Sequence, residues 1–575
     1  MKYKSTFILF LMLAGWSHAK TYPNPLGINL TAPGGWGLEF VDAAKYATEW
    51  TRPDGTKANL DANGWPQEDA QVVLFDLRFF GAWWGAPYDD PDERQADVGG
   101  LYKLKFTGEA KIVFPESGGL FVLSNQQHDP ETDITTADLY LKGPHDPNDP
   151  ENPNKVGSGE HSGLLVLQFL NTGGGIKNLT LIRPGYHGRT EQTFTDEFIK
   201  LIKPFSVLRF MDWIKTNNSS PFHGDPWPAN TTRWDVNRNK ITDATQRSWG
   251  NRPNYTAWEY IIELSNLVQK DLWICIPVSA DDDYVKKLAI LMRTGVDMGS
   301  TDVSGDYDLA DGTPTCKPLD SSLKIYLEHS NEVWNFGFKQ YIYNKLAAIA
   351  EAKQPDHILS KDGLKDEEML ARRRHLKRTI ETGQIFSEVF ADQMKGKPLF
   401  AKIRPIYTHR IAKINTEWEA QLRWGSKQWK PLKKYLYALG GAPYFDLNGA
   451  LKADESVDDI LEHAEDDIED TDKKEGLIDL ADDYQLKAIC YEGGPDSGGG
   501  KTVNIQNRIR ANRDPRIRAL IQKDIEDHWF KLGGDLFMYF ESSGRCGRYG
   551  CWGAVEGVSE VDQPKYQALI DLTGQ

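Results

Sequence analysis

Short apolar runs divide the chain into two parts with different patterns. Between about residues 50 and 185, β-like runs are separated by Gly, Pro, Asp and Asn, and no helical periodicity intervenes. The clearest runs are 72–75, 102–106, 111–114, 164–169 and 179–182. Short strands at this spacing, with turn residues between them, are typical of an all-β sandwich.

The second part, from about residue 194 onward, alternates apolar runs with helical segments. Its seven strand candidates are 207–211, 272–277, 323–328, 403–407, 435–439, 486–491 and 535–540. An eighth candidate, 26–30, precedes the β-rich region and is followed by a helix-like segment at 40–46. Alternation of this kind predicts parallel strands joined by helices, and eight units predict a closed (β/α)8 barrel. The alternative is an open doubly wound sheet, but no Gly-rich phosphate loop follows any strand.

The order of the two patterns predicts an insertion. Residues 20–50 would form the first strand and helix of the barrel, 51–185 an inserted β-sandwich, and 186–575 the remainder of the barrel. The sandwich is expected to be either an accessory sugar-binding module or a wall of the cleft, and the sequence does not choose between them.

The N-terminus has the features of a secretory signal peptide. Lys2 and Lys4 precede the apolar run 7–13, and small residues lead to Ala19. The run is too short to span a bilayer, so we expect residues 1–19 to be removed. No later apolar run approaches the roughly 18 residues of a membrane helix. We therefore expect a secreted or periplasmic protein without membrane insertion.

Composition narrows the class of ligand. A net charge of −16 argues against nucleic acid, whose phosphates require basic patches. The 18 Trp and 23 Tyr residues suit either a large aromatic core or the binding of sugar rings. Five cysteines are too few for a disulfide scaffold. Cys546 and Cys551 are close enough in sequence to form a disulfide in an oxidising compartment, and whether they do so is left open.

Two acidic residues stand where a barrel places its active site. Glycosidic bond cleavage requires two carboxyl groups on either side of the anomeric carbon. In a barrel, such groups lie at the carboxyl ends of strands. The fourth strand candidate leads to Glu332, and the seventh leads to Glu492. Period-two alternation predicts that Glu328, Cys490 and Glu492 face inward and that Tyr491 faces the helices.

These residues resemble the signature of clan A retaining glycoside hydrolases. Asn331-Glu332 after strand four and Glu492 after strand seven carry the resemblance, and Arg209 is similar to the clan's strand-two arginine. The segment 326–335 also resembles bacterial secreted members with an inserted β-domain. The resemblance implies that Glu332 is the acid/base, that Glu492 is the nucleophile, and that Asn331 contacts the sugar. Strand eight departs from it, because Tyr539-Phe540-Glu541 stands where the clan often has tryptophan.

Further substrate contacts are expected around the same mouth. Trp213 follows strand two, Trp334 follows strand four, and His409 and Tyr444 end strands five and six. The alternative for His409 and Tyr444 is a loop residue bonded to backbone, and Trp334 would equally suit packing under a loop. Glu328 is expected to be a buried structural carboxylate paired with a basic group. No metal or organic cofactor is expected.

The sequence thus predicts a secreted retaining glycoside hydrolase of a β-linked polysaccharide or oligosaccharide. Retention implies a separation of about 5–5.5 Å between the carboxyl groups of Glu332 and Glu492. Two alternatives remain. One is a non-catalytic carbohydrate-binding protein on a barrel scaffold, and the other is an inverting hydrolase or a lyase of an acidic polysaccharide.

Overall fold

The computed structural model describes residues 25–34, 38–76, 89–90, 98–115, 121–141, 164–217, 234, 240–244, 246 and 256–574. The predicted signal peptide, residues 1–19, lies outside this part of the chain. Within it, no helix combines the length and the apolar character that crossing a membrane requires. The same residues hold no group of three or more His, Cys, Asp or Glu side chains arranged to bind a metal ion.

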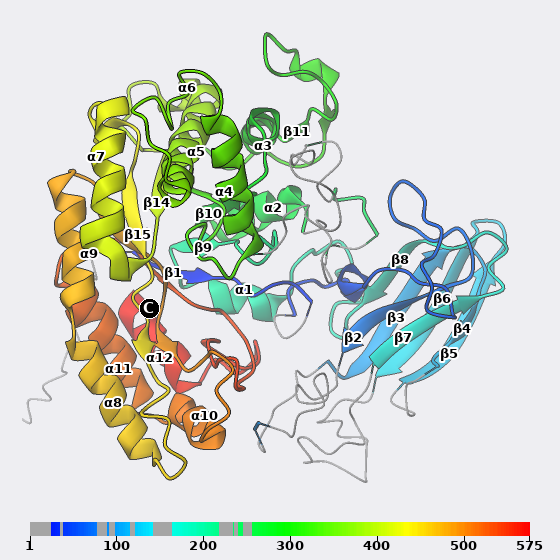
Figure 1. The fold of residues 1–575 in the computed structure, drawn as a ribbon. Helices are drawn as coiled ribbons and strands as arrows, with labels where there is room; N and C mark the ends of the chain where they lie inside the picture. The colour runs from blue at the N-terminus through cyan, green and yellow to red at the C-terminus, as the bar shows by residue number, and fades with distance from the viewer. Residues whose placement is uncertain are drawn as a thin grey trace, which may run out of the picture.

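Eight parallel strands close into a barrel, and this confirms the predicted fold class (Figure 1). In chain order they are β1 (Leu26–Asn29), β9 (Val207–Arg209), β10 (Asp271–Ile276), β13 (Ile325–His329), β14 (Ile403–Thr408), β15 (Ala438–Gly441), β17 (Lys487–Gly493) and β19 (Phe537–Tyr539). Each strand pairs with its neighbours in this order, and β1 pairs with both β9 and β19. The sixth strand begins later than predicted, because residues 432–434 form a short 3₁₀ turn.

Helices cover the outside of the barrel, so its strands are buried on both faces. Every residue of β1, β9, β13 and β15 is buried. The principal helices are α1 (Asp196–Ile202), α2 (Trp258–Val268), α3 (Asp282–Thr294), α4 (Lys339–Ala352), α5 (Glu367–Val389), α7 (Glu419–Gln428), α8 (Val457–Glu469), α9 (Asp472–Asp483), α10 (Ile505–Arg513), α11 (Ile517–Gln522) and α12 (Pro564–Thr573).

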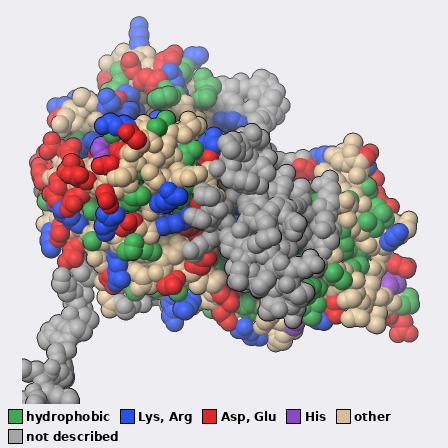
Figure 2. All heavy atoms as spheres, turned by 90° about the horizontal axis from the view of Figure 1, so that it is seen from below, with side chains coloured by type: hydrophobic (Ala, Val, Ile, Leu, Met, Phe, Trp, Pro, Cys, Tyr) green, Lys and Arg blue, Asp and Glu red, His purple; other side chains and the backbone are tan. Residues whose placement is uncertain are grey.

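Helices α8 and α9 form the acidic connection between the sixth and seventh barrel strands. Their sequences, VDDILEHAEDDIE and DKKEGLIDLADD, place apolar residues on the inner face and carboxylates on the outer one. Figure 2 shows acidic side chains gathered on the flank of the barrel where these helices lie. This acidic run is therefore a solvated helix surface.

Two antiparallel sheets lie beside the barrel and form the β-sandwich (Figure 1). The four-stranded sheet contains β3 (Gly100–Thr107), β5 (Phe121–Asp129), β6 (Ile134–Leu141) and β8 (Lys177–Ile182), and the three-stranded sheet contains β2 (Ala70–Asp76), β4 (Lys111–Val113) and β7 (Leu164–Leu170). Aromatic side chains from the two sheets meet between them. Phe106 packs edge-on against Phe169 with ring centroids 5.2 Å apart, and Phe75 packs against Tyr102 at 5.9 Å.

The segments that enter and leave the sandwich run side by side. The Val41 N–H donates to the Thr193 carbonyl, and the Arg183 N–H donates to the Val41 carbonyl. The helix expected at 40–46 is only a short 3₁₀ helix, Ala43–Tyr46, because residues 40 and 42 instead form β-bridges with the returning segment. These pairings attach the sandwich between β1 and α1.

Candidate active site

Glu332 and Glu492 both lie at the carboxyl-terminal mouth of the barrel, where the strands end. Glu332 follows β13 in a loop in which Ser330 has φ +62° and Glu332 itself has φ +41°. Positive φ is uncommon for residues with side chains, and it is concentrated at functional sites. Glu492 is the second-to-last residue of β17, directly before Gly493. The loops after the fourth and seventh strands therefore present one carboxylate each.

A β-bulge in β17 changes which side chains reach the mouth. The pairing of β17 with β19 shifts register between Cys490 and Gly493. A bulge interrupts the period-two alternation, so two successive side chains, Tyr491 and Glu492, both point inward. Tyr491 contacts Glu332 and Arg209 inside the barrel. The buried Cys490 thiol instead lies near Lys474 of helix α9 and near Asp524. The prediction that Cys490 faces inward and Tyr491 outward is therefore wrong.

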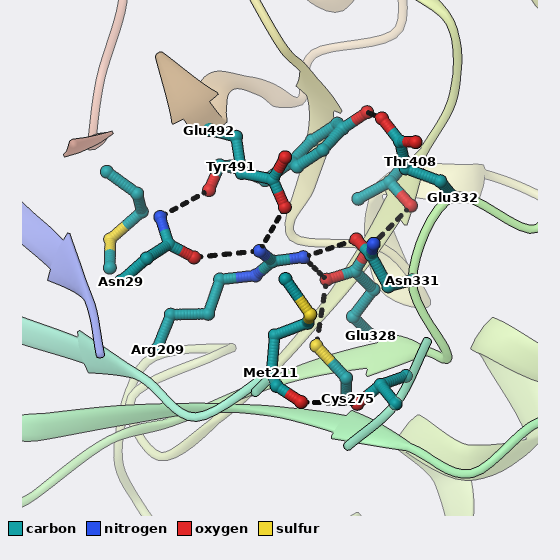
Figure 3. A network of polar contacts seen from close by, with 12 residues as sticks. Asn29, Arg209, Met211, Cys275, Glu328, Asn331, Glu332, Thr408, Tyr491 and Glu492 are labelled. Carbon is teal, nitrogen blue, oxygen red and sulfur yellow. Dashed lines mark hydrogen bonds and ion pairs between the residues drawn. The ribbon is translucent and has the colours of Figure 1, made fainter. Parts of the chain in front are cut away.

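Arg209 lies beneath the mouth and binds four acceptors at once (Figure 3). Its Nη1 donates to Glu492 Oε1 at 2.7 Å and to Asn29 Oδ1 at 2.8 Å. Its Nη2 donates to Glu328 Oε2 and to Asn331 Oδ1, both at 2.8 Å. The guanidinium is completely buried, and despite burial, which lowers the pKa of Arg209, the surrounding acidic groups raise it well above its usual range.

Glu328 is the structural carboxylate that the sequence predicts, with Arg209 as its partner. It also accepts hydrogen bonds from the Trp273 indole at 3.0 Å and the Thr408 hydroxyl at 2.9 Å. Its side chain is fully buried, so both oxygens are occupied by protein donors and are closed to substrate. Of the three central glutamates, Glu328 is the one without access to the mouth.

Glu492 is surrounded by groups that favour its ionised form. One oxygen accepts from Arg209, and the other accepts from the Tyr444 hydroxyl at 3.1 Å. Burial raises the pKa of Glu492 above its usual value, and the charge and hydrogen bond of Arg209 offset part of that rise. Burial also raises the pKa of Tyr444 well above its usual range, so its phenol keeps the proton that it donates. The direct ion pair makes Glu492 the first of the two mouth glutamates to ionise.

Glu332 has no cation in direct contact among the described residues. Its oxygens accept from the Tyr491 hydroxyl at 3.1 Å and from the Asn335 side-chain amide at 2.9 Å. Burial, followed by the negative charge of Glu492, raises the pKa of Glu332 to about 7. Two glutamates in one mouth thus have unequal environments, one paired with a cation and one holding its proton near neutrality.

A cavity of about 260 Å³ opens beside Glu332. Its lining includes Glu332, Trp334, Tyr444 and Tyr491. The Trp334 ring lies parallel to the His409 ring, with an interplanar angle of 6° and centroids 6.2 Å apart. Trp334 therefore presents an aromatic wall next to the carboxylate in this cavity. The structure thus brings Trp334 and Tyr444 together at this mouth, as the sequence predicts.

The structure places the remaining predicted contacts below the surface of the mouth. His409 is 1% exposed, its Nδ1 accepts the Arg410 N–H, and burial lowers its pKa well below the usual value. It supports Trp334 from behind. Asn331 is 2% exposed, accepts from Arg209 and donates to Asn217, so its amide is already bonded on both sides. Arg209 itself is buried and positions the carboxylates.

Trp213 does not line the cleft, and the expectation that it binds substrate is wrong. It is 1% exposed and stacks on Phe198 with ring centroids 6.0 Å apart. Phe210 packs edge-on against it at 5.4 Å, and its indole N–H donates to the Thr31 carbonyl. Both faces of its ring therefore pack in the hydrophobic core and are closed to substrate.

Two further acidic residues, Asp212 and Glu541, lie close enough to Glu492 to interact with its charge. Asp212 follows β9, and burial, followed by the charge of Glu492, raises its pKa to about 7. Glu541 follows β19, and burial, followed by the charge of Asp212, raises its pKa well above the usual range. Asp212, like Trp213, is a candidate for lining the cleft because it follows strand two, but the sequence assigns no role to Glu541, Tyr491 or Asn335. The strand-end positions of Asp212 and Glu541 were the available signal.

Comparisons with known proteins find only solved structures of low sequence identity and low TM-score. No family model matches the sequence, and no curated protein matches it. The chain is similar to the Penicillium canescens endo-1,4-beta-xylanase XylE at 11% identity and TM-score 0.30, over 68% of this chain and 91% of that one. It is similar to native xylanase10C from Cellvibrio japonicus at 9% identity and TM-score 0.28, over 86% and 89%. The likeness is too low to carry an argument about chemistry.

Removal of the Arg209 charge tests the electrostatic arrangement. In Arg209→Met, Glu328 and Glu492 lose their only direct cationic partner among the described residues, and breaking a buried ion pair costs about 3–5 kcal/mol. We expect this loss in the free energy of unfolding, measured by urea denaturation at pH 7.5. The double variant Arg209→Met/Glu328→Gln should recover part of it, because one uncompensated charge is gone. Equal stability of Arg209→Met and the wild type would contradict the assignment.

Proposed function

We propose that this protein is a retaining glycoside hydrolase that acts on a β-linked polysaccharide or oligosaccharide. The observation that carries the proposal is the inequality of two neighbouring glutamates. Glu492 is bonded to Arg209 at 2.7 Å, and Glu332, without such a partner, has a pKa raised to about 7 by burial and by Glu492. A double displacement needs this combination of an ionised nucleophile and a protonated acid.

The first step of the proposed reaction breaks the glycosidic bond. A Glu492 oxygen attacks the anomeric carbon, and the Glu332 proton passes to the departing glycosidic oxygen. The Glu492–sugar ester forms as the leaving sugar departs with that proton. Arg209 and Tyr444 keep the nucleophile ionised and oriented through their bonds to its two oxygens.

The second step releases the sugar. Glu332, now ionised, accepts a proton from water while the water oxygen attacks the anomeric carbon and the ester bond to Glu492 breaks. Glu332 is again protonated and Glu492 again ionised at the end of the cycle. The Tyr491 and Asn335 hydrogen bonds support Glu332 in its ionised form between the two steps. The anomeric configuration of the substrate is retained.

We infer that the leaving-group side of the substrate lies in the cavity beside Glu332, against the Trp334 ring. The proton donor has to lie next to the departing oxygen, and this cavity borders Glu332 and Trp334. His409, stacked behind Trp334, fixes the orientation of that ring. We also propose that residues 1–19 direct export and that the enzyme acts on sugars outside the cytoplasm.

The variant Glu332→Gln tests the proposed acid. We expect turnover of the polysaccharide substrate to fall by about 10²–10⁴-fold, because the leaving oxygen no longer receives a proton. Substrate binding should persist, since the amide keeps the shape of the carboxyl group. Reducing-end release and binding isotherms measure the two effects, and Glu109→Gln, an exposed turn substitution in the sandwich, is the control. A protein that only binds carbohydrate would show no turnover in the wild type either.

The pH dependence of activity tests the pKa of Glu332. Because the acid has to be protonated in the free enzyme, we expect kcat/KM on the polysaccharide to fall as the pH rises through about 7. An aryl glycoside whose leaving group departs without a proton should show a smaller fall over the same range. A flat profile to pH 9 with the polysaccharide would show that Glu332 is not the acid.

A further inference from the structure

A hairpin close to the candidate active site brings two cysteines together. Gly547 and Gly550 exchange two backbone hydrogen bonds, of 3.0 and 3.1 Å, around the turn formed by Arg548 and Tyr549. The next residues outward, Cys546 and Cys551, therefore face each other as a non-hydrogen-bonded antiparallel pair. The Cα atoms of such a pair lie about 4.5 Å apart, and disulfides span Cα separations of about 4.4–6.8 Å.

The side chains of the two cysteines are also in contact. Cys546 is 6% exposed and Cys551 is 1% exposed, and the two pack in one apolar cluster with Ile509 of α10. Burial followed by the neighbouring thiol raises the pKa of Cys546 well above the usual value. Burial also raises the pKa of Cys551, but the Cys546 hydrogen bond and the Lys565 charge together lower it below the usual value. Cys551 is thus the better nucleophile of the pair.

We propose that Cys546 and Cys551 are a disulfide-forming pair that closes this hairpin when the chain is exposed to a disulfide oxidant. The oxidant is a small-molecule or protein disulfide. The Cys551 thiolate attacks one of its sulfurs, which forms a mixed disulfide and releases one thiolate. The Cys546 thiolate, after loss of its proton to solvent, attacks the Cys551 sulfur and releases the second thiolate. Two thiols are oxidised, and the oxidant disulfide is reduced to two thiols.

The bond would hold one wall of the mouth in place. Trp552 directly follows Cys551, its indole donates to Asp496 Oδ1 at 3.2 Å, and its carbonyl accepts the Glu541 N–H. The Trp552 ring packs edge-on against Phe540 at 5.8 Å, and Phe540 packs edge-on against Tyr444 at 6.2 Å. Tyr444 in turn bonds to Glu492. A fixed hairpin therefore restrains the aromatic contacts that end at the carboxylate.

The other three cysteines supply an internal control. Cys275 and Cys490 are buried in different barrel strands, and Cys316 follows β12 (Thr313–Pro314). In the described structure all five cysteines are thiols. Oxidation that involves only the hairpin pair leaves these three as thiols.

Thiol counting after controlled oxidation tests the proposal. The full chain is refolded in a mixture of reduced and oxidised glutathione, denatured without reductant, treated with N-ethylmaleimide, and weighed by mass spectrometry. We expect three adducts on the five cysteines and a peptide that contains the Cys546–Cys551 link. Cys316→Ser should give two adducts and the same link. Five adducts, or three with a different link, would overturn the proposal.

The stability of the wild-type protein toward urea, measured with and without reductant, tests the disulfide without relying on the folding of a variant. The oxidised wild type should unfold at a higher urea concentration than the same protein treated with dithiothreitol. The double variant Cys546→Ser/Cys551→Ser should show no response to dithiothreitol. A response of equal size in the double variant would contradict the assignment of the link to the hairpin. None of these readouts depends on hydrolytic activity.

Discussion

The buried guanidinium of Arg209 is the group on which the arrangement of the mouth depends. Its two terminal nitrogens donate hydrogen bonds to one side chain on β1, one on β17, one on β13 and one in the loop after β13. One residue of the second barrel strand therefore connects three other strands. A planar fork matches several oxygens in fixed directions, which a lysine ammonium does not. The aromatic rings of Trp273 and Tyr491 also lie close to Arg209, each with its centroid 5.3 Å from the guanidinium carbon.

This connection explains why neighbouring glutamates differ. Glu328 forms an ion pair with Arg209 inside the barrel, where its side chain is fully buried. Glu492 forms an ion pair with the same guanidinium at the edge of the mouth. Glu332 stands beyond direct reach and is supported only by neutral donors, Tyr491 and Asn335. A buried carboxyl without a counter-ion favours its protonated form, so the arginine that pairs with Glu492 leaves Glu332 as the acid.

Much of this arrangement was predictable from the sequence, for definite physical reasons. Apolar runs alternating with helices follow from burial of parallel strands on both faces, and they correctly predict all eight strands and the positions of Glu332 and Glu492 at strand ends. The inward position of Tyr491 was not predictable. It depends on a bulge in the pairing of β17 with β19, and the sequence of β17 alone does not show how the two strands pair. Trp213 and His409 follow strands as cleft residues do, yet tertiary packing buries them.

Trapping of the covalent intermediate tests the central claim most directly. A 2-deoxy-2-fluoro β-glycoside with an activated leaving group slows release of the sugar from the nucleophile more than it slows attack. The protein is incubated with a panel of such glycosides and then digested for peptide mass spectrometry. We predict a fluorosugar ester on Glu492, with prompt release of one equivalent of leaving group. An ester on another residue, or turnover of the natural substrate with inversion and no trapped ester, would contradict the account.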